Sequence, residues 1–419
     1  MTTALATAVA RGGMTRNRQR GYGIFYLLLA IVIAAFFGQV EPGSTTTFGM
    51  NIGAAEVPDL IVPSAGTAYV LAGLAAMAGV IQLTRGFGAR WAIVMALVIS
   101  GFAFGFLTWA GSGGSMNLAG ILQTTLQRSV PITFGAMSGI ICERAGVVNI
   151  AIEGMLLSGA FASAVVASAT GNSWIGIGAA IVTGGLLAAL LAVLAIRYLV
   201  DQIIAGVVIN ILVVGITSFL QARVLAKMPE LNSPERFGPI EIPFLTDLPL
   251  VGGILFRQNF FVYACIVCVF ILHFMLFSTR WGLRVRAVGE HPKAADTVGI
   301  NVYFVRYRNV ILGGMLAGLG GAFFTIGSTG SFQAEMTAGR GFIGLAAVIF
   351  GAWAPLGAFL AGIVFGFAEA VQARLSILNF GLPSQFLHMV PYLVTIIVVA
   401  GLVGRVRAPA ADGRPYIKG

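Results

Sequence analysis

Charged residues are scarce in this chain. Asp, Glu, Lys and Arg make up 10% of its 419 residues, whereas 58% are hydrophobic. Soluble domains carry about 25% charged residues, so a soluble fold of this length could not bury so much apolar surface. A bilayer accommodates it, because apolar side chains can face lipid. The apolar runs are long and unbroken, and do not alternate over roughly ten residues as in a membrane barrel. The sequence therefore predicts an all-α, polytopic transmembrane helical bundle.

Residue types that support catalysis or metal binding are equally few. The chain has three cysteines, three histidines and three lysines. No lysine stands in a G-x-x-x-x-G-K-[ST] phosphate loop, and neither H-E-x-x-H nor G-x-S-x-G occurs. Cys265 and Cys268 lie inside an apolar run, where two small helix residues are a simpler interpretation than a redox or metal site. We predict no catalytic residue, no metal and no cofactor, and therefore not an enzyme.

Twelve apolar segments approach or exceed the roughly 20 residues that a spanning helix needs. They lie at 22–40, 61–83, 91–111, 119–142, 149–170, 174–199, 203–224, 259–278, 307–328, 338–353, 355–374 and 389–405. The segment at 338–353 is short enough to be re-entrant, and Arg128 and Pro131 interrupt the segment at 119–142. We expect about 10–12 spans in a membrane domain at 22–405.

The net charge of +10 is explained by orientation in the membrane. No basic run with interleaved aromatic residues is present, so we predict no nucleic-acid partner. Cytoplasmic segments are rich in Lys and Arg, and 18 of the 25 basic residues lie inside if the tail at 1–21 is cytoplasmic. The other seven are Arg128, Arg223, Lys227, Arg236, Arg257, Arg340 and Arg374. Both termini, including a tail at 406–419, are then cytoplasmic.

Two hydrophilic segments separate the predicted spans. The segment at 227–258 is external in this orientation and holds five of the fifteen prolines, which argues against a regular helix. The segment at 279–308 is the longest internal loop. In its middle, Pro292–Val298 can form a short helix that Pro292 opens and Gly299 closes.

Polar residues interrupt the apolar pattern most clearly in ERAGVVNIAIEGMLLSG, at 143–159. Asn149, Glu153 and Gly154 lie in this run. One interpretation is a discontinuous helix, whose free backbone groups line a cavity. The other is a cytoplasmic turn followed by an ordinary helix N-terminus, where the helix dipole favours Glu153. Glu369 is a second acid at membrane depth. It is either functional or hydrogen-bonded to a neighbouring helix.

These motifs resemble the permease subunits of ATP-binding-cassette importers, in the superfamily that carries ribose, nucleosides and branched-chain amino acids. ERAGVVNIAIEGM is similar to the E-R-[SA]-G-V-x-N-[IL]-x-x-E-G-M signature of that group. Further similar segments follow in the same order: TLQRSVPI at 125–132, DQIIAGVVIN at 201–210, VGEHPKAADTVGINV at 288–302, GRGFIGLAAVIFGAWAPLGAF at 339–359 and VPYLVTIIVVA at 390–400. The resemblance covers about 121–402 and is strongest to the nucleoside branch. Asp201 and Gln202 depart from it, since Asn-Glu is common there.

The resemblance implies a subunit of an importer in the bacterial plasma membrane. A cytoplasmic ATPase, an extracellular solute-binding lipoprotein and a second permease subunit, in a heterodimer, would be its partners beside membrane lipid. The solute would be a nucleoside, with a sugar or a branched-chain amino acid as alternatives. An ion-driven secondary transporter is a further alternative.

The resemblance and the polar pattern together nominate two groups of residues. The predicted solute-pathway residues are Asn149, Glu153, Gly154, Asn210 and Arg340. The predicted residues of a coupling helix that docks on the ATPase are Gly289, Glu290, Pro292, Ala294, Ala295 and Gly299.

Overall fold

The computed structural model describes residues 16–52, 57–377 and 407–418, which form two compact units. The first ends at Gly120 and the second begins at Ile121. The predicted span at 389–405 lies outside the described residues. The described part is mostly helical with only short strands, which confirms the predicted all-α membrane fold.

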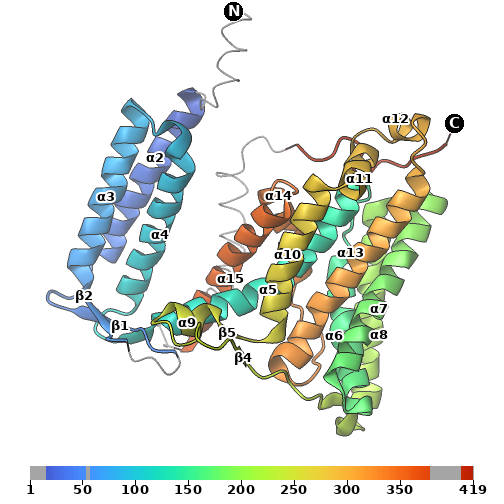
Figure 1. The fold of residues 1–419 in the computed structure, drawn as a ribbon. Helices are drawn as coiled ribbons and strands as arrows, with labels where there is room; N and C mark the ends of the chain where they lie inside the picture. Colours follow the sequence, from blue (N-terminus) through green and yellow to red (C-terminus); the bar gives the residue numbers. More distant parts are fainter. Residues whose placement is uncertain (1–15, 53–56, 378–406, 419) are drawn as a thin grey trace, which may run out of the picture. The chain divides into compact units, whose positions relative to one another are not determined.

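The first unit contains three long helices and one small sheet (Figure 1). The helices are α2 (Arg16–Val32, continued by a π-helical turn at Ile33–Phe37), α3 (Ser64–Thr84) and α4 (Trp91–Ala110, preceded by a short 3-10 turn at Gly88–Arg90). The strands are β1 (Thr45–Gly49), β2 (Leu60–Pro63) and β3 (Ser115–Asn117), in the order β2-β1-β3. β1 pairs antiparallel with β2 and parallel with β3. Each helix is long and apolar enough to cross a bilayer.

The second unit contains more helices, several of which are more deeply buried than those of the first unit. Its main helices are α5 (Leu118–Arg144), α6 (Ile152–Thr170), α7 (Ser173–Ala192), α8 (Gln202–Leu220), α10 (Phe260–Ser278), α13 (Val302–Phe324), α14 (Arg340–Phe350) and α15 (Pro355–Ile377). π-helical turns extend α7, α8 and α13 to Arg197, Leu225 and Thr329. α6, α7 and α13 lie side by side (Figure 1).

Glycine makes this close packing possible. A Cβ on Gly318 of α13 would lie 2.1 Å from the carbonyl oxygen of Ala180 in α7. A Cβ on Gly321 would lie 2.1 Å from the carbonyl oxygen of Leu156 in α6. Backbones that approach so closely leave no space for any side chain, as is typical of membrane helix interfaces.

Nine of the twelve predicted spans correspond to helices that are long and apolar enough to cross a membrane, within the part of the chain that is described. α5 replaces the predicted span at 119–142. It is 27 residues long, but its polar and charged residues keep it out of that set. α14 is the predicted short segment and has only 11 residues. At a rise of 1.5 Å per residue it is about 16 Å long, roughly half of the ~30 Å hydrocarbon core.

The two hydrophilic segments contain more structure than the sequence indicated. The segment at 227–258 holds a 3-10 turn (Pro229–Asn232), a two-strand pairing of β4 (Ile240–Glu241) with β5 (Arg257–Gln258), and the short helix α9 (Val251–Leu255). The segment at 279–308 is mostly helical, with α11 (Arg280–Glu290) and α12 (Pro292–Thr297) before α13 begins at Val302. The expectation of a loop up to 308 was therefore wrong.

Candidate functional site

The backbone between α5 and α6 turns back into the bundle without forming a helix. After the turn at Ala145–Gly146, a buried non-helical stretch leads to α6, which starts level with Gly135 and Gly139 of α5, well before α5 ends. Irregular backbone at this depth needs hydrogen-bond partners from the protein. α8 provides them, since Gln202 Oε1 accepts from the Val148 amide at 2.7 Å and Asn210 Nδ2 donates to the Ile150 carbonyl at 2.9 Å. This geometry favours the discontinuous-helix interpretation.

Three of the predicted solute-pathway residues hold this junction together. Asn210 Oδ1 accepts a hydrogen bond from the Gly154 amide at 2.8 Å and so satisfies a free donor in the first turn of α6. A Cβ on Gly154 would lie 2.9 Å from that same oxygen, which explains the glycine. Asn149 is fully buried and its Nδ2 lies 3.3 Å from Ser138 Oγ. Asn149, Gly154 and Asn210 therefore have clear structural partners within the protein.

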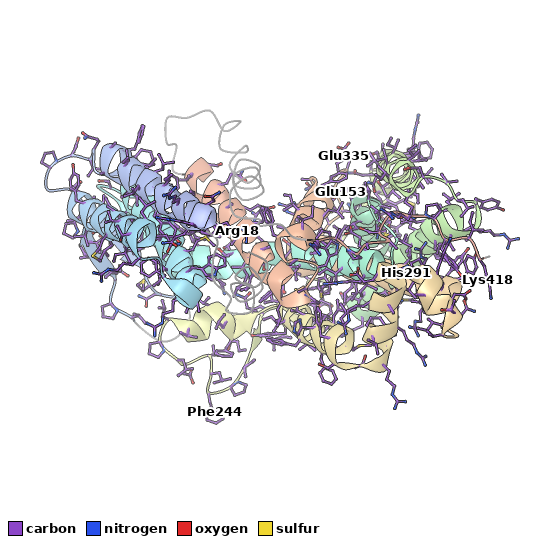
Figure 2. All side chains as sticks on the ribbon, turned by 90° about the horizontal axis from the view of Figure 1, so that it is seen from above. Arg18, Glu153, Phe244, His291, Glu335 and Lys418 are labelled. Atoms are coloured by element: carbon purple, nitrogen blue, oxygen red, sulfur yellow. The ribbon has the colours of Figure 1, made fainter. Side chains whose placement is uncertain are left out.

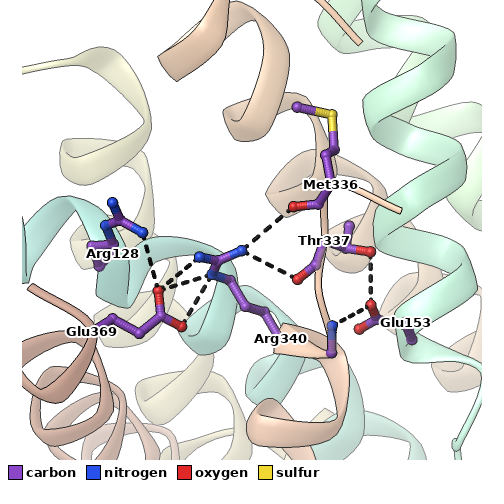
Figure 3. Close-up of polar contacts among 7 residues, drawn as sticks. Arg128, Glu153, Met336, Thr337, Arg340 and Glu369 are labelled. Atoms are coloured by element: carbon purple, nitrogen blue, oxygen red, sulfur yellow. Dashed lines mark hydrogen bonds and ion pairs between the residues drawn. The ribbon is translucent and has the colours of Figure 1, made fainter. Parts of the chain in front are cut away.

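Glu153 binds the N-terminus of another helix, α14. Its Oε1 accepts from Thr337 Oγ1 at 2.7 Å (Figure 3). Oε1 also accepts from the Gly339 amide at 2.8 Å, and Oε2 accepts from the Gly341 amide at 2.6 Å. A buried carboxylate is well placed there, because free amides and the helix dipole favour negative charge. The carboxylate thus anchors α14 to α6.

This contact explains the glycines on either side of Arg340. Gly339 precedes α14 with φ +78°, in the left-handed region that glycine adopts without strain. A Cβ on Gly341 would lie 2.6 Å from the Glu153 Cα. The G-R-G segment therefore brings the start of α14 directly against α6.

Arg340 itself points in the other direction and forms an ion pair with Glu369 of α15 (Figure 3). Arg340 Nε and Nη2 both donate to the Glu369 carboxylate, at 2.8–3.1 Å, and Arg128 Nη1 of α5 lies 3.5 Å from Glu369 Oε2. The guanidinium of Arg340 also lies over the Phe324 ring, 5.5 Å from its centroid. Glu369 is therefore a bundle-facing acid that pairs with two arginines.

A cavity of about 320 Å³ opens beside this ion pair. Its residues come from α5, from the end of α13, from the segment after it and from α14. They are Thr124, Gln127, Arg128, Pro131, Phe323, Phe324, Ser328, Thr329, Gln333, Met336 and Arg340. Two phenylalanines thus accompany two amides, two arginines and three hydroxyls. Small-molecule sites occupy roughly 300–1,000 Å³ and combine apolar walls with a few polar groups, as this cavity does.

Of the predicted solute-pathway residues, only Arg340 lines this cavity. Asn149, Glu153, Gly154 and Asn210 form the junction between α5, α6, α8 and α14 instead. The cavity residues that were missed include Gln127, Gln333 and Met336. A signal for some of them existed, because Gln127 and Arg128 were polar residues inside a predicted span.

The predicted coupling residues lie in and around α12. Pro292 is the first residue of α12, His291 Nδ1 accepts from the Ala294 amide, and Gly299 follows with φ +84°. Pro292–Val298 was thus predicted correctly as a short helix closed by glycine. Ala294 is exposed whereas Ala295 is buried.

Gly289 and Glu290 belong to α11, where Gly289 is buried against the end of α5 and Glu290 is exposed. A Cβ on Gly289 would lie 2.2 Å from the Arg144 carbonyl oxygen, and Glu290 Oε2 accepts from the Ala410 amide. The described residues contain no cluster of His, Cys, Asp or Glu suited to a metal ion.

The second unit is the part of the chain that known proteins share. The family described as branched-chain amino acid transport system/permease component matches residues 121–399. The chain belongs to this permease family. A guanosine ABC transporter permease of Bacillus subtilis is 40% identical over 308 residues, which cover 71% of this chain and 97% of that protein. A nucleoside ABC transporter permease of Lactococcus lactis is 38% identical, with 72% and 99% covered.

A more distant relative is named for a different solute. A putative glucose ABC transporter permease of Haloferax volcanii is 35% identical, with 68% and 92% covered. No solved structure matches the chain. The chain is thus a multi-pass permease subunit of an ABC importer in a bacterial plasma membrane, a transporter component rather than an enzyme. Such permeases work with an ATPase and a solute-binding protein.

Proposed function

We propose that the solute of this permease is a nucleoside and that it passes through the cavity beside Arg340. The similarity to a guanosine permease and a nucleoside permease supports the solute class. The cavity supports it chemically, because the Phe323 and Phe324 rings offer flat apolar surface to a base, while Gln127, Arg128 and Gln333 offer hydrogen bonds to base and ribose. Glu369 offsets part of the positive charge of the arginines, which suits a neutral polar solute.

Glucose is the second candidate, because the relative from Haloferax volcanii carries that name. Both solutes need hydrogen bonds, but only the nucleoside has an extended aromatic plane. Branched-chain amino acids need partners for a charged amine and carboxylate. Ion-driven transport is disfavoured, because the family depends on an ATPase.

We further propose that α12 is the coupling helix and that the ATPase binds it in the cytoplasm. α12 is short, its Ala294 is exposed, and its neighbours are rich in arginine, as expected of a cytoplasmic segment. The segment at 227–258 then faces the solute-binding lipoprotein. A second permease completes a heterodimer, as the relatives of B. subtilis and L. lactis occur in pairs of differently named permeases.

Labelling tests this orientation. Phe244 is 89% exposed and points away from the protein in Figure 2. In intact cells, a membrane-impermeant maleimide should label Phe244→Cys, and it should label Lys293→Cys only after the membrane is opened. Labelling of both from the same side would overturn the orientation.

Uptake by the full complex tests the solute. We expect guanosine or uridine, but neither glucose nor leucine, to be taken up and to stimulate ATP hydrolysis. Gln333→Ala should raise KM about 3- to 10-fold, the effect of losing one neutral hydrogen bond. Gln221→Ala, outside the cavity, is the control. Unchanged KM in Gln333→Ala and in Gln127→Ala would show that the solute does not use this cavity.

A further inference from the structure

The C-terminal segment at 407–418 lies against the helices that precede α13. Lys418 and His291 are found on the same part of the second unit in Figure 2, and α12 lies next to the C-terminus in Figure 1. Three of its residues, Pro409, Ala411 and Tyr416, are buried although they belong to the end of the chain. This segment, which lies beyond the family match at 121–399, is therefore packed as part of the fold.

Backbone hydrogen bonds fix the first half of this segment. The Ala411 amide donates to the Gly289 carbonyl of α11 at 2.8 Å. Arg306 Nη1 of α13 donates to the Arg414 carbonyl at 3.0 Å, and Arg306 is only 1% exposed. Because a buried arginine needs partners, the Arg414 carbonyl is important to Arg306, whose Nε and Nη2 have no hydrogen-bond partner among the described residues.

The same residues meet the turn between α5 and α6. Gly146 has φ +83°, and a Cβ there would lie 2.8 Å from Arg306 Nη2 and 3.1 Å from the Ala411 carbonyl oxygen. A Cβ on Gly289 would lie closer still to its neighbour, 2.2 Å from the Arg144 carbonyl oxygen. Four pieces of chain thus meet with no space to spare: α11, α13, the turn at 145–146 and the C-terminal segment.

The second half of the segment lies beside α12. The Tyr416 and Tyr303 rings are 5.4 Å apart, and Lys418 Nζ lies 3.9 Å from Asp296 Oδ1. Ile417, which stands between Tyr416 and Lys418 in the sequence, is 64% exposed. Val298, which follows α12, is 75% exposed. Two large apolar side chains therefore project from neighbouring pieces of chain at the predicted coupling helix.

We propose that the C-terminal segment is an integral part of the ATPase-docking surface: it fixes α11 and α12 against the bundle and presents Ile417 beside Val298. This inference rests on the proposed role of α12. A helix of six residues has little stability of its own, so tertiary contacts must hold it when the ATPase moves. The contacts through Gly289, Arg306 and Tyr303 provide this support.

The test uses the complete complex with the ATPase, extracted in detergent. We compare a chain that stops after Val406 with Ile417→Asp and Val298→Asp. Arg414→Ala is the control, because Arg414 contributes its backbone carbonyl to the described contacts. Co-purified ATPase, solute-stimulated ATP hydrolysis and the thermal unfolding of the permease alone are measured.

We expect the truncated chain and Ile417→Asp each to retain at least tenfold less ATPase than the control. Ile417→Asp should leave Tm unchanged, which separates docking from folding if truncation impairs folding. Normal ATPase retention in Ile417→Asp together with loss in Val298→Asp would overturn the role of the C-terminal segment and leave α12 as the docking helix. Normal retention in both would overturn the proposed role of α12 as well.

Discussion

The two units of this chain bury different kinds of polar group. In the described part of the first unit, the buried polar side chains are Thr46, Ser64, Gln82 and Thr108, none of which is charged. The second unit buries Glu143, Glu153, Arg306 and Glu369 as well as several amides. Charged groups inside a membrane protein are costly and generally functional. The family match also begins at residue 121. The buried charges therefore lie in the unit that this chain shares with its permease family.

Glycine shows the same contrast. In the first unit, a Cβ on Gly79 would lie 2.8 Å from Leu27 Cγ, an atom of a flexible side chain. In the second unit, the equivalent atom on Gly318 would meet backbone carbonyl oxygen. Leu27 can move to accommodate a larger residue at position 79, whereas the Ala180 backbone cannot move in the same way for one at position 318. The helices of the second unit are fitted to one another at the level of the backbone.

The largest expected effect comes from Glu369→Gln. This change leaves Arg340 and Arg128 without their shared counter-charge, and breaking a buried pair costs about 3–5 kcal/mol. Gln82→Met in the first unit removes a neutral buried group and should cost about 1 kcal/mol. The temperature of thermal unfolding and the rate of uptake should both fall strongly in Glu369→Gln, but not in Gln82→Met. Similar losses of stability in the two variants would show that buried charge in the second unit matters no more than buried neutral groups in the first.

The next effect concerns glycine. Gly318→Ala should destabilise the protein by about 3 kcal/mol, because overpacking against the rigid Ala180 carbonyl forces the helices apart. Gly79→Ala should cost about 1 kcal/mol or less, since Leu27 can change rotamer. Midpoints of unfolding in the same detergent provide the measurement. A larger loss in Gly79→Ala would contradict the contrast between side-chain and backbone packing.

The smallest effect concerns pH and is expected in the second unit. Burial raises the pKa of Asp412 to about 7, although the Gly413 amide and Arg306 oppose this. Glu143 and Cys142 of α5 also interact electrostatically with Asp412. Because the docked carboxyl binds its proton more tightly than the free one, docking of the C-terminal segment is strongest below about pH 4 and weakens as pH rises through 7.

Hydrogen exchange of the Ala411 amide checks this, after correction for the intrinsic rate at each pH. Protection should be about two- to fivefold lower at pH 8 than at pH 6, because the raised pKa of Asp412 lies between these two values. Asp412→Asn should show equal protection at both values. A wild-type chain with protection that does not change, or that increases with pH, would disprove the role of Asp412.

Local patterns predicted much of this fold. Long apolar runs located nine spans, and Pro292 and Gly299 located the ends of α12 because both act on their own backbone. α11 was missed, since RWGLRVRAVGE was interpreted as a charged loop although Val285 and Val288 face inward. The length and charge of a span can be read from a short stretch of sequence. Which face of α11 is buried depends instead on the helices that pack against it.

The site was less predictable because its key contacts join distant residues. Glu153 and Arg340 were both recognised as unusual, but sequence could not show that Glu153 binds amides 186 and 188 residues away. Nor could it pair Arg340 with Glu369 or place Gln333 beside Gln127. Asn149 and Asn210 were assigned to the solute because polar residues at membrane depth suggest a pathway. In the structure, the Asn210 amide bonds the irregular backbone before α6, and the Asn149 amide lies against the Ser138 hydroxyl of α5.

The length of α14 has a consequence for the transport barrier. A helix that covers roughly half of the hydrocarbon core leaves the other half of its column to the non-helical segment before it and to the cavity that this segment lines. On the proposed pathway, a solute in that cavity would exchange part of its hydration for protein contacts. The barrier that ATP-driven movement would then have to open is the part of the column that α14 fills.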